Sequence, residues 1–217
     1  MRVLGRMRRM PGCSVMKRVL VIGGGAAGMM AAVSAAEHGA AVVILEKMPT
    51  PGRKILIAGK GRCNVTNVGD IPTFIRNMPG NGPFLYSALH AFSNRDLMAW
   101  LEKQGVPLKT ERGGRVFPAS DRARDVVAAF ARAHAGLGVE VAAGRAVQAI
   151  LTEGGRACGA VDAQGRRWPA DAVVLTTGGA SYPQTGSSGD AYRMAAALGH
   201  CIVPLRPSLV PLTVAEG

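Results

Sequence analysis

Three features of the sequence predict an α/β protein, a three-layer fold built on a parallel sheet with a small antiparallel sheet inserted. An apolar run, residues 19–22, ends in a cluster of glycines and passes directly into an alanine-rich segment, as a buried strand does when it turns into a helix. A second apolar run, residues 41–45, follows after one helix length. Short strand-like segments then fill residues 139–169, before a last apolar run at 172–177. This order of segments indicates a Rossmann-like fold that binds a dinucleotide such as FAD or NAD(P).

The turn after the first strand carries the glycine spacing of a dinucleotide-binding motif. Gly23, Gly25 and Gly28 stand in the order G-x-G-x-x-G, although glycine-rich turns are common and the motif alone is a weak signal. Gly23 allows a tight turn, Gly25 leaves room for a pyrophosphate, and Gly28 lets the helix lie close to the strand. The helix, expected at 29–38, offers N-terminal N–H groups to phosphates. The expected cofactor contacts in this turn are Gly23, Gly24, Gly25, Ala26, Ala27 and Gly28.

Glu46 ends the second strand at nearly the spacing of the acid that binds the ribose of a dinucleotide. One carboxylate can accept both ribose hydroxyls, whereas it would repel a 2′-phosphate. Glu46 therefore favours FAD or NAD over NADP. The alternative is an ordinary exposed glutamate at a strand end.

A loop rich in hydrogen-bond donors is expected at residues 52–67, where glycines alternate with basic and amide side chains. Its sequence, G-R-K-x-x-x-x-G-x-G-R-C-N-x-T-N, follows the glycine turn and the pair Glu46-Lys47. In this the chain resembles the flavoproteins with two dinucleotide-binding domains. More narrowly, it resembles the bacterial NAD(P)/FAD-dependent oxidoreductase family that includes 3-dehydro-bile-acid delta-4,6-reductase and aminoacetone oxidase. The resemblance implies that the loop runs alongside FAD, with Arg62, Cys63 and Asn64 near the flavin ring and with Lys47, Lys54 and Gly61 among the cofactor contacts.

The middle of the chain predicts helices at 83–92, at 95–104 with Ser93 or Asn94 as cap, and a third that Ser120 caps and that runs to about Ala135. The last of these has Ala123, Val126, Val127, Phe130 and Ala131 on one face, and its His134 is expected to be solvated. A turn between short strands is expected within residues 109–119. By the family resemblance Arg115 lies near the active-site cleft, and a structural arginine in a hairpin is the alternative.

The region from residue 139 predicts four short strands, at 139–142, 146–152, 156–162 and 166–169, which suit a small antiparallel sheet before the last parallel strand. By the resemblance, the backbone of Val147 lies against the adenine. The last strand ends in Thr177-Gly178-Gly179, where the backbone can approach the cofactor a second time. A helix is expected at 191–198, with Ser188 or Asp190 as a possible cap. Tyr182, which precedes this helix, is expected either to lie over the flavin or substrate or to be a buried structural residue.

Composition narrows the class of protein. The formal charge of +12 suggests nucleic acid as a partner, but the basic residues are scattered, and a basic surface that attracts anionic cofactors is the preferred interpretation. Four widely spaced cysteines without a C-x-x-C pair argue against a zinc site and fit a reducing cytoplasm. Arg62 could lower the pKa of the Cys63 thiol, although packing against the flavin is the preferred role for Cys63. Residues 19–36 carry no charged side chain and are long enough to span a membrane. Their glycines nevertheless favour a strand, a turn and a helix over a membrane span.

These observations predict an FAD-dependent oxidoreductase. The resemblance implies hydride transfer through flavin N5, either in NAD(P)H-linked reduction of an activated C=C bond or in oxidation of a small amine. We expect residues 1–15 to be a disordered extension or an over-called start, 16–205 the FAD-binding domain, and 206–217 the start of a truncated substrate domain, so that this chain is inactive alone. The expected partner is a small-molecule substrate, with no nucleic acid and no membrane, and no metal ligand is predicted. The alternatives are a nicotinamide-only dehydrogenase and a flavoprotein with an RNA-associated role.

Overall fold

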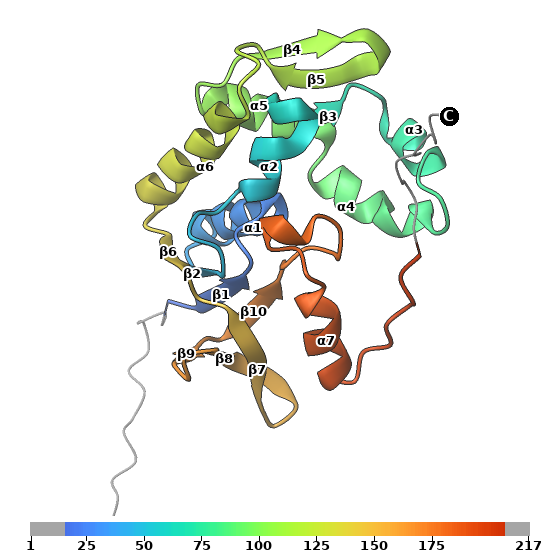
Figure 1. Ribbon diagram of the computed structural model, residues 1–217. Coiled ribbons are helices and arrows are strands. Elements are labelled where there is room, and N and C mark those ends of the chain that lie inside the picture. The colour runs from blue at the N-terminus through green and yellow to red at the C-terminus, as the bar shows by residue number, and fades with distance from the viewer. Residues whose placement is uncertain (1–15, 207–217) are drawn as a thin grey trace, which may run out of the picture.

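A parallel four-stranded sheet forms the centre of the structure, a computed structural model that describes residues 16–206 (Figure 1). Its strand order is β10–β1–β2–β6. The strands are β1 (Arg18–Ile22), β2 (Ala41–Glu46), β6 (Glu140–Ala143) and β10 (Ala172–Leu175). Segments 1–15 and 207–217, to which the extension and most of the substrate-domain start were assigned, lie outside the described residues. The predicted α/β fold with a parallel sheet is confirmed.

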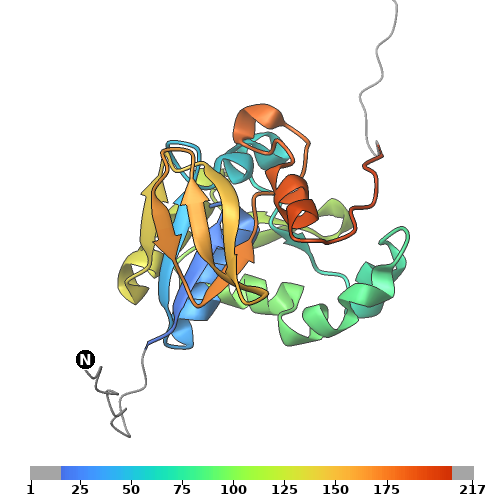
Figure 2. The same ribbon diagram turned by 90° about the horizontal axis from the view of Figure 1, so that it is seen from below.

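Alternation along β1 explains the three layers. Leu20 and Ile22 pack toward the small antiparallel sheet, whereas Val21 packs toward the helices. The antiparallel sheet has the order β7 (Val147–Glu153), β8 (Arg156–Asp162), β9 (Arg167–Pro169). Helix α1 (Ala26–Glu37) covers the other face, and α6 (Ala123–Leu137) packs on α1. Figure 2 shows the antiparallel sheet beside the central sheet from below.

The segment expected to be the first antiparallel strand belongs to the central sheet. β6 pairs in parallel with β2, with Ile44 opposite Val141. The prediction of four antiparallel strands is therefore wrong in this strand and right in the other three. A short apolar strand after a helix has the same sequence pattern in a parallel and in an antiparallel sheet, because periodicity does not show which strand it pairs with.

A second region lies at the opposite end of the molecule from β7–β9 (Figure 1). The supposed loop at 52–67 contains α2 (Arg53–Ile57), η1 (Ala58–Gly61) and β3 (Thr66–Asn67). There follow α3 (Ile71–Arg76), η2 (Gly82–Leu85), α4 (Tyr86–Ala91) and α5 (Asn94–Lys103). A hairpin of β4 (Leu108–Glu111) and β5 (Arg115–Pro118), joined by η3 (Arg112–Gly114), pairs with β3. The hairpin and the Ser93 cap of α5 are as predicted, the latter with a full capping box.

Helix α6 differs from its prediction in three details. Ser120 does not cap it, because its hydroxyl bonds the Asp125 carboxylate and the helix begins at Ala123. Ala131 is exposed, since the helix turns Ala129 and Ala133 inward. His134 is buried rather than solvated, and its Nε2 lies 3.0 Å from the carbonyl oxygen of Met29 in α1.

The chain returns past β10 through η4 (Pro183–Thr185) to α7 (Asp190–Ala197). Gly189, with φ +79°, is the N-cap of α7, so neither Ser188 nor Asp190 caps it. Tyr182 is 60% exposed, which excludes the buried structural role. Across residues 16–206, every helix is too short or too polar to cross a membrane, and residues 19–36 form strand, turn and helix as predicted.

Candidate cofactor site

A cavity of about 540 Å³ opens where the carboxyl ends of β1, β2 and β10 meet the N-terminus of α1. Ligands of open parallel sheets bind at this edge. Most of the residues predicted to contact a cofactor lie in its wall: Gly23, Gly24, Gly25, Ala26, Ala27, Glu46, Lys47, Lys54, Cys63, Asn64, Val147, Thr177 and Gly178. Gly28, Gly61, Arg62 and Gly179 lie outside the wall. The structure thus brings together residues that are more than 150 positions apart, such as Gly23 and Gly178.

The three motif glycines meet different surroundings. Gly23 has φ +104°, and a Cβ there would lie 2.5 Å from the Thr176 carbonyl oxygen. A Cβ on Gly28 would lie 1.9 Å from the Gly23 oxygen, so this glycine is what lets α1 start against β1. A Cβ on Gly25 would meet nothing within 4 Å. The fold itself requires glycine at 23 and 28, whereas Gly25 faces open space.

The Glu46 side chain is buried and stabilises the glycine turn at 23–28 through hydrogen bonds. Its Oε2 accepts from the N–H of Gly24 at 2.7 Å, and its Oε1 accepts from the N–H of Met48 at 2.7 Å. The interpretation as an ordinary exposed glutamate is therefore wrong. Each carboxylate oxygen has a second lone-pair direction, so hydrogen-bond capacity remains for hydroxyls in the cavity.

The end of β10 presents two threonines that behave differently. Thr176 Oγ1 lies 3.0 Å from the carbonyl oxygens of both Ile22 and Gly23 and so joins β10 to the glycine turn. Thr177 lines the cavity, and its Oγ1 is buried without a hydrogen-bond partner among the described residues. An unsatisfied buried hydroxyl is costly, so a polar ligand beside Thr177 would remove a penalty.

The two lysines predicted to contact the cofactor bind the loop between β10 and α7. Lys47 Nζ donates to Ser188 Oγ at 2.6 Å and to Asp190 Oδ2 at 2.7 Å. Lys54 Nζ donates to the Ser181 carbonyl oxygen at 2.9 Å. Both side chains remain in the cavity wall.

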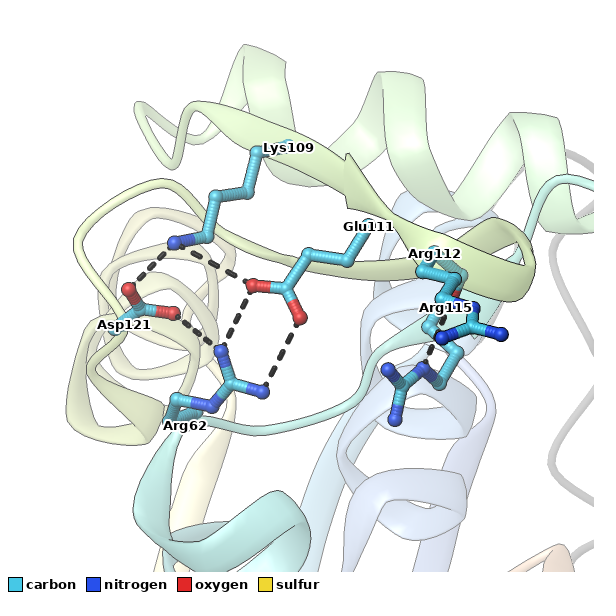
Figure 3. A network of polar contacts seen from close by, with 6 residues as sticks. All are labelled: Arg62, Lys109, Glu111, Arg112, Arg115 and Asp121. Atoms are coloured by element: carbon cyan, nitrogen blue, oxygen red, sulfur yellow. Dashed lines mark hydrogen bonds and ion pairs between the residues drawn. The ribbon is translucent and has the colours of Figure 1, made fainter.

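Arg62 lies outside the cavity wall and joins a network of charges, which Figure 3 shows. Its guanidinium bonds both oxygens of Glu111, at 2.8 and 3.2 Å, and reaches Asp121 at 3.2 Å. Lys109 pairs with the same two acids. The hydrogen bond from Arg62 lowers the pKa of Glu111, and that from Lys109 lowers the pKa of Asp121. Arg62 therefore fixes its segment to the β4–β5 hairpin.

The arginines of the hairpin turn stand apart from this network in Figure 3. Arg115 Nε donates to the carbonyl oxygen of Arg112 at 3.1 Å. Among residues 16–206 neither arginine forms an ion pair, both are exposed, and neither lines the cavity. The structure therefore supports the hairpin interpretation of Arg115 over a position in the cleft.

Cys63 lines the cavity but is not an activated thiol. The Arg62 guanidinium is committed to Glu111 and Asp121, and burial raises the pKa of the Cys63 thiol to about 11. The hypothesis of a lowered thiol pKa is wrong, because the neighbouring positive charge points to other partners. The Asn64 amide faces the carbonyl oxygens of Thr66 and Val116, and in the orientation that points its nitrogen at them it donates over 3.1 and 3.3 Å, which ties this wall to β3 and β5.

Sequence reasoning missed the apolar end of the cavity. This end is formed by side chains from four helices and the segment before α5, namely Met30, Ile55, Phe92, Leu97, Val126 and Phe130. Arg53 and Arg145 were also missed, although Arg53 stands in the same G-R-K triplet as Lys54. Arg145 places its backbone N–H 2.8 Å from the Glu46 carbonyl oxygen, and its guanidinium lies 3.5 Å from the buried Asp162 carboxylate. The apolar residues at this end of the cavity, Met30 and Phe130 among them, carry no sequence signal that distinguishes them from ordinary core residues.

Comparison with known proteins assigns this architecture to a family. The family profile described as "HI0933-like protein Rossmann domain" matches residues 17–213. A curated relative, 3-dehydro-bile acid delta(4,6)-reductase of Clostridium scindens, is 35% identical over 184 residues, covering 81% of this chain and 42% of the relative. The ribosomal RNA dihydrouridine synthase of Escherichia coli is 30% identical over 196 residues, covering 90% of this chain and 48% of that protein. The chain thus spans less than half the length of these relatives.

A solved structure supports the fold. A flavocytochrome c3 fumarate reductase superposes with a TM-score of 0.65 over 86% of this chain and 41% of its own, at 23% identity. At this identity the likeness concerns the fold alone.

Proposed function

The chain belongs to the HI0933-like family of Rossmann-domain proteins, and on that premise we propose that it holds FAD for the reduction of an activated carbon–carbon double bond. The observation that carries the proposal is the open backbone at Gly25. It sits at the N-terminus of α1, where a glycine that the fold does not need leaves space for a ligand. That space and the N–H groups of α1 suit a pyrophosphate.

The two ends of the cavity suit the two ends of FAD. The Glu46 carboxylate, which can accept further hydrogen bonds, would accept them from the hydroxyls of the adenosine ribose. Val147 lies in the same cavity wall. At the other end, the apolar side chains Ile55, Val126 and Phe130 would take up a flat ring system. FAD, when bound, supplies hydride transfer at flavin N5. Thr177 Oγ1 would gain the polar partner that it lacks.

The reaction class is taken from the relatives. Both curated names describe adding hydrogen to a double bond, one in a dehydro bile acid and one in uridine. A small molecule with a C=C bond conjugated to a carbonyl is the substrate class we propose, with NAD(P)H as the electron donor and the cytoplasm as the location. The protein's part in that chemistry is to bind the cofactor, orient it and exclude water around the apolar end.

The proposal is tested with Gly25→Ala. We expect weak but saturable binding of FAD to the chain, measured by quenching of flavin fluorescence, and at least a tenfold loss of affinity in Gly25→Ala with an unchanged melting temperature. The matched control is Gly136→Ala in α6, where a Cβ also meets nothing within 4 Å and which is remote from the cavity wall. Absence of saturable FAD binding by the folded chain, equal binding by Gly25→Ala, or tighter binding of NADH than of FAD would contradict the proposal.

A uridine within RNA is a second candidate substrate, favoured by the Escherichia coli relative and by the exposed Arg112 and Arg115. The phosphates of RNA would be attracted by these two charges. Fluorescence anisotropy of a labelled RNA oligonucleotide distinguishes the candidates. Binding that weakens steeply with salt and falls in Arg112→Gln/Arg115→Gln supports RNA, and no binding at low salt supports a small molecule.

A further inference from the structure

The 178–190 loop leads from the end of β10 to the first residue of α7 and contributes Gly178, Thr185, Gly186, Ser187 and Asp190 to the wall of the cofactor cavity. Hydrogen bonds join it to the segment that follows β2 and to α2. Two lysines hold it there from separate elements, Lys47 after β2 and Lys54 in α2.

The loop packs tightly against Lys47 and Met48. Gly186 has φ +97°, and a Cβ there would lie 2.9 Å from Met48 Cγ and 3.3 Å from Lys47 Cε. A Cβ on Gly178 would lie 2.9 Å from the hydroxyl of Ser187, which is itself buried. Two glycines thus allow contacts on both sides of the loop that no larger residue would allow.

The charge of Lys47 is satisfied within the protein. Its ammonium lies 2.7 Å from Asp190 Oδ2 and donates to Ser188, and the two charged side chains are each about three-quarters buried. Burial raises the pKa of Asp190, but the hydrogen bonds from Lys47 and Ser188 outweigh it, so that the pKa lies below its ordinary value. A lysine paired in this way contributes little net charge toward a phosphate.

We propose that Lys47 is a positioning residue rather than a cofactor ligand: its ion pair with Asp190 fastens the 178–190 loop over the dinucleotide cavity, and the cofactor enters and leaves when this pair opens. This inference rests on the proposed function. Lys54, bonded to Ser181, is a second and weaker fastening, because its partner is a neutral carbonyl.

The direction in which two charge-removing variants change FAD binding distinguishes this role from direct binding by Lys47. If the pair is a fastening, Lys47→Gln and Asp190→Asn both speed FAD dissociation by roughly tenfold, the effect expected for losing a part-buried charged hydrogen bond. The double variant is then no faster than the faster single variant, because both remove the same contact. If Lys47 binds a phosphate directly, Lys47→Gln weakens binding and Asp190→Asn strengthens it, because a negative charge has been removed.

The rates are measured by stopped-flow flavin fluorescence on the full chain, alongside melting temperatures. Lys47→Arg keeps the charge and restores slow dissociation if the ion pair is what matters. Lys17→Gln is the matched control, since Lys17 pairs with Asp171 away from the cavity wall. Opposite signs for the two single variants, or unchanged rates in both, would overturn the inference while FAD binding by the parent chain still stands. A chain that binds no FAD refutes the proposed function instead.

Discussion

Two parts of the cavity wall are built by different means. The turn at 23–28 is backbone, shaped by glycines and held by hydrogen bonds to Glu46 and Thr176. The wall at Cys63 and Asn64, by contrast, is kept in place by side chains: the adjacent Arg62 binds two acids near the hairpin, and the Asn64 amide faces neighbouring strands. At Gly23 and Gly28 the backbone wall leaves no room for a Cβ, whereas a wall held by ion pairs responds to charge and salt. The following changes test this contrast.

Gly28→Ala is expected to have the largest effect on folding. Its Cβ would lie 1.9 Å from the Gly23 oxygen, so α1 must move away from β1, at a cost of about 3 kcal/mol in the free energy of unfolding. Chemical denaturation measures this value. Gly25→Ala in the same turn should stay near the parent, and equal stability of the two variants would refute the distinction between a fold-required and a ligand-required glycine.

Arg62→Met is expected to loosen the second wall without unfolding the protein. Glu111 and Asp121 then share Lys109 alone, two like charges without the guanidinium between them. We expect a lower melting temperature, a changed dependence of that temperature on salt, and faster proteolysis in the turn at 112–114. Arg76→Met is the control, because within residues 16–206 the Arg76 side chain bonds only the Thr73 hydroxyl, on the exposed helix α3. A salt dependence unchanged from the parent would show that the network does not hold the wall.

The Cys63 thiol gives the smallest effect at neutral pH and the clearest one at alkaline pH. Because burial raises its pKa from about 9 to about 11, the thiol stabilises the fold fully below pH 9, and this contribution is lost as pH rises toward 11. The loss is on the order of 2 kcal/mol. Stability measured against pH should fall less in Cys63→Ala over this range. Thiol labelling of Cys63 at pH 8, as fast as that of the exposed Cys201, would contradict the raised pKa.

The sequence predicted the backbone wall much better than the side-chain wall. Gly28 is constrained by the carbonyl oxygen of Gly23 in the same turn, so the local spacing reveals it. Gly23 is crowded by Thr176, 153 residues later, but it belongs to the same local motif and was found through that spacing. Arg62 could not be placed, since its partners Glu111 and Asp121 lie 49 and 59 residues away and nothing local indicates the pairing. The same holds for His134, whose partner Met29 is 105 residues away, and for β6, whose neighbour was not evident. The site assignments themselves remain predictions until a cofactor is bound.

The pairing of β1 with β10 has a consequence for how the protein is made. Arg18 bonds Asp171, 153 residues later, and the Gly23 turn packs on Thr176. A chain that emerges from the ribosome N-terminus first therefore carries β1 with one bare edge until nearly all of the described residues have been synthesised. Such an edge invites pairing with other chains. Nascent chains stalled before residue 170 are therefore the form most in need of a chaperone.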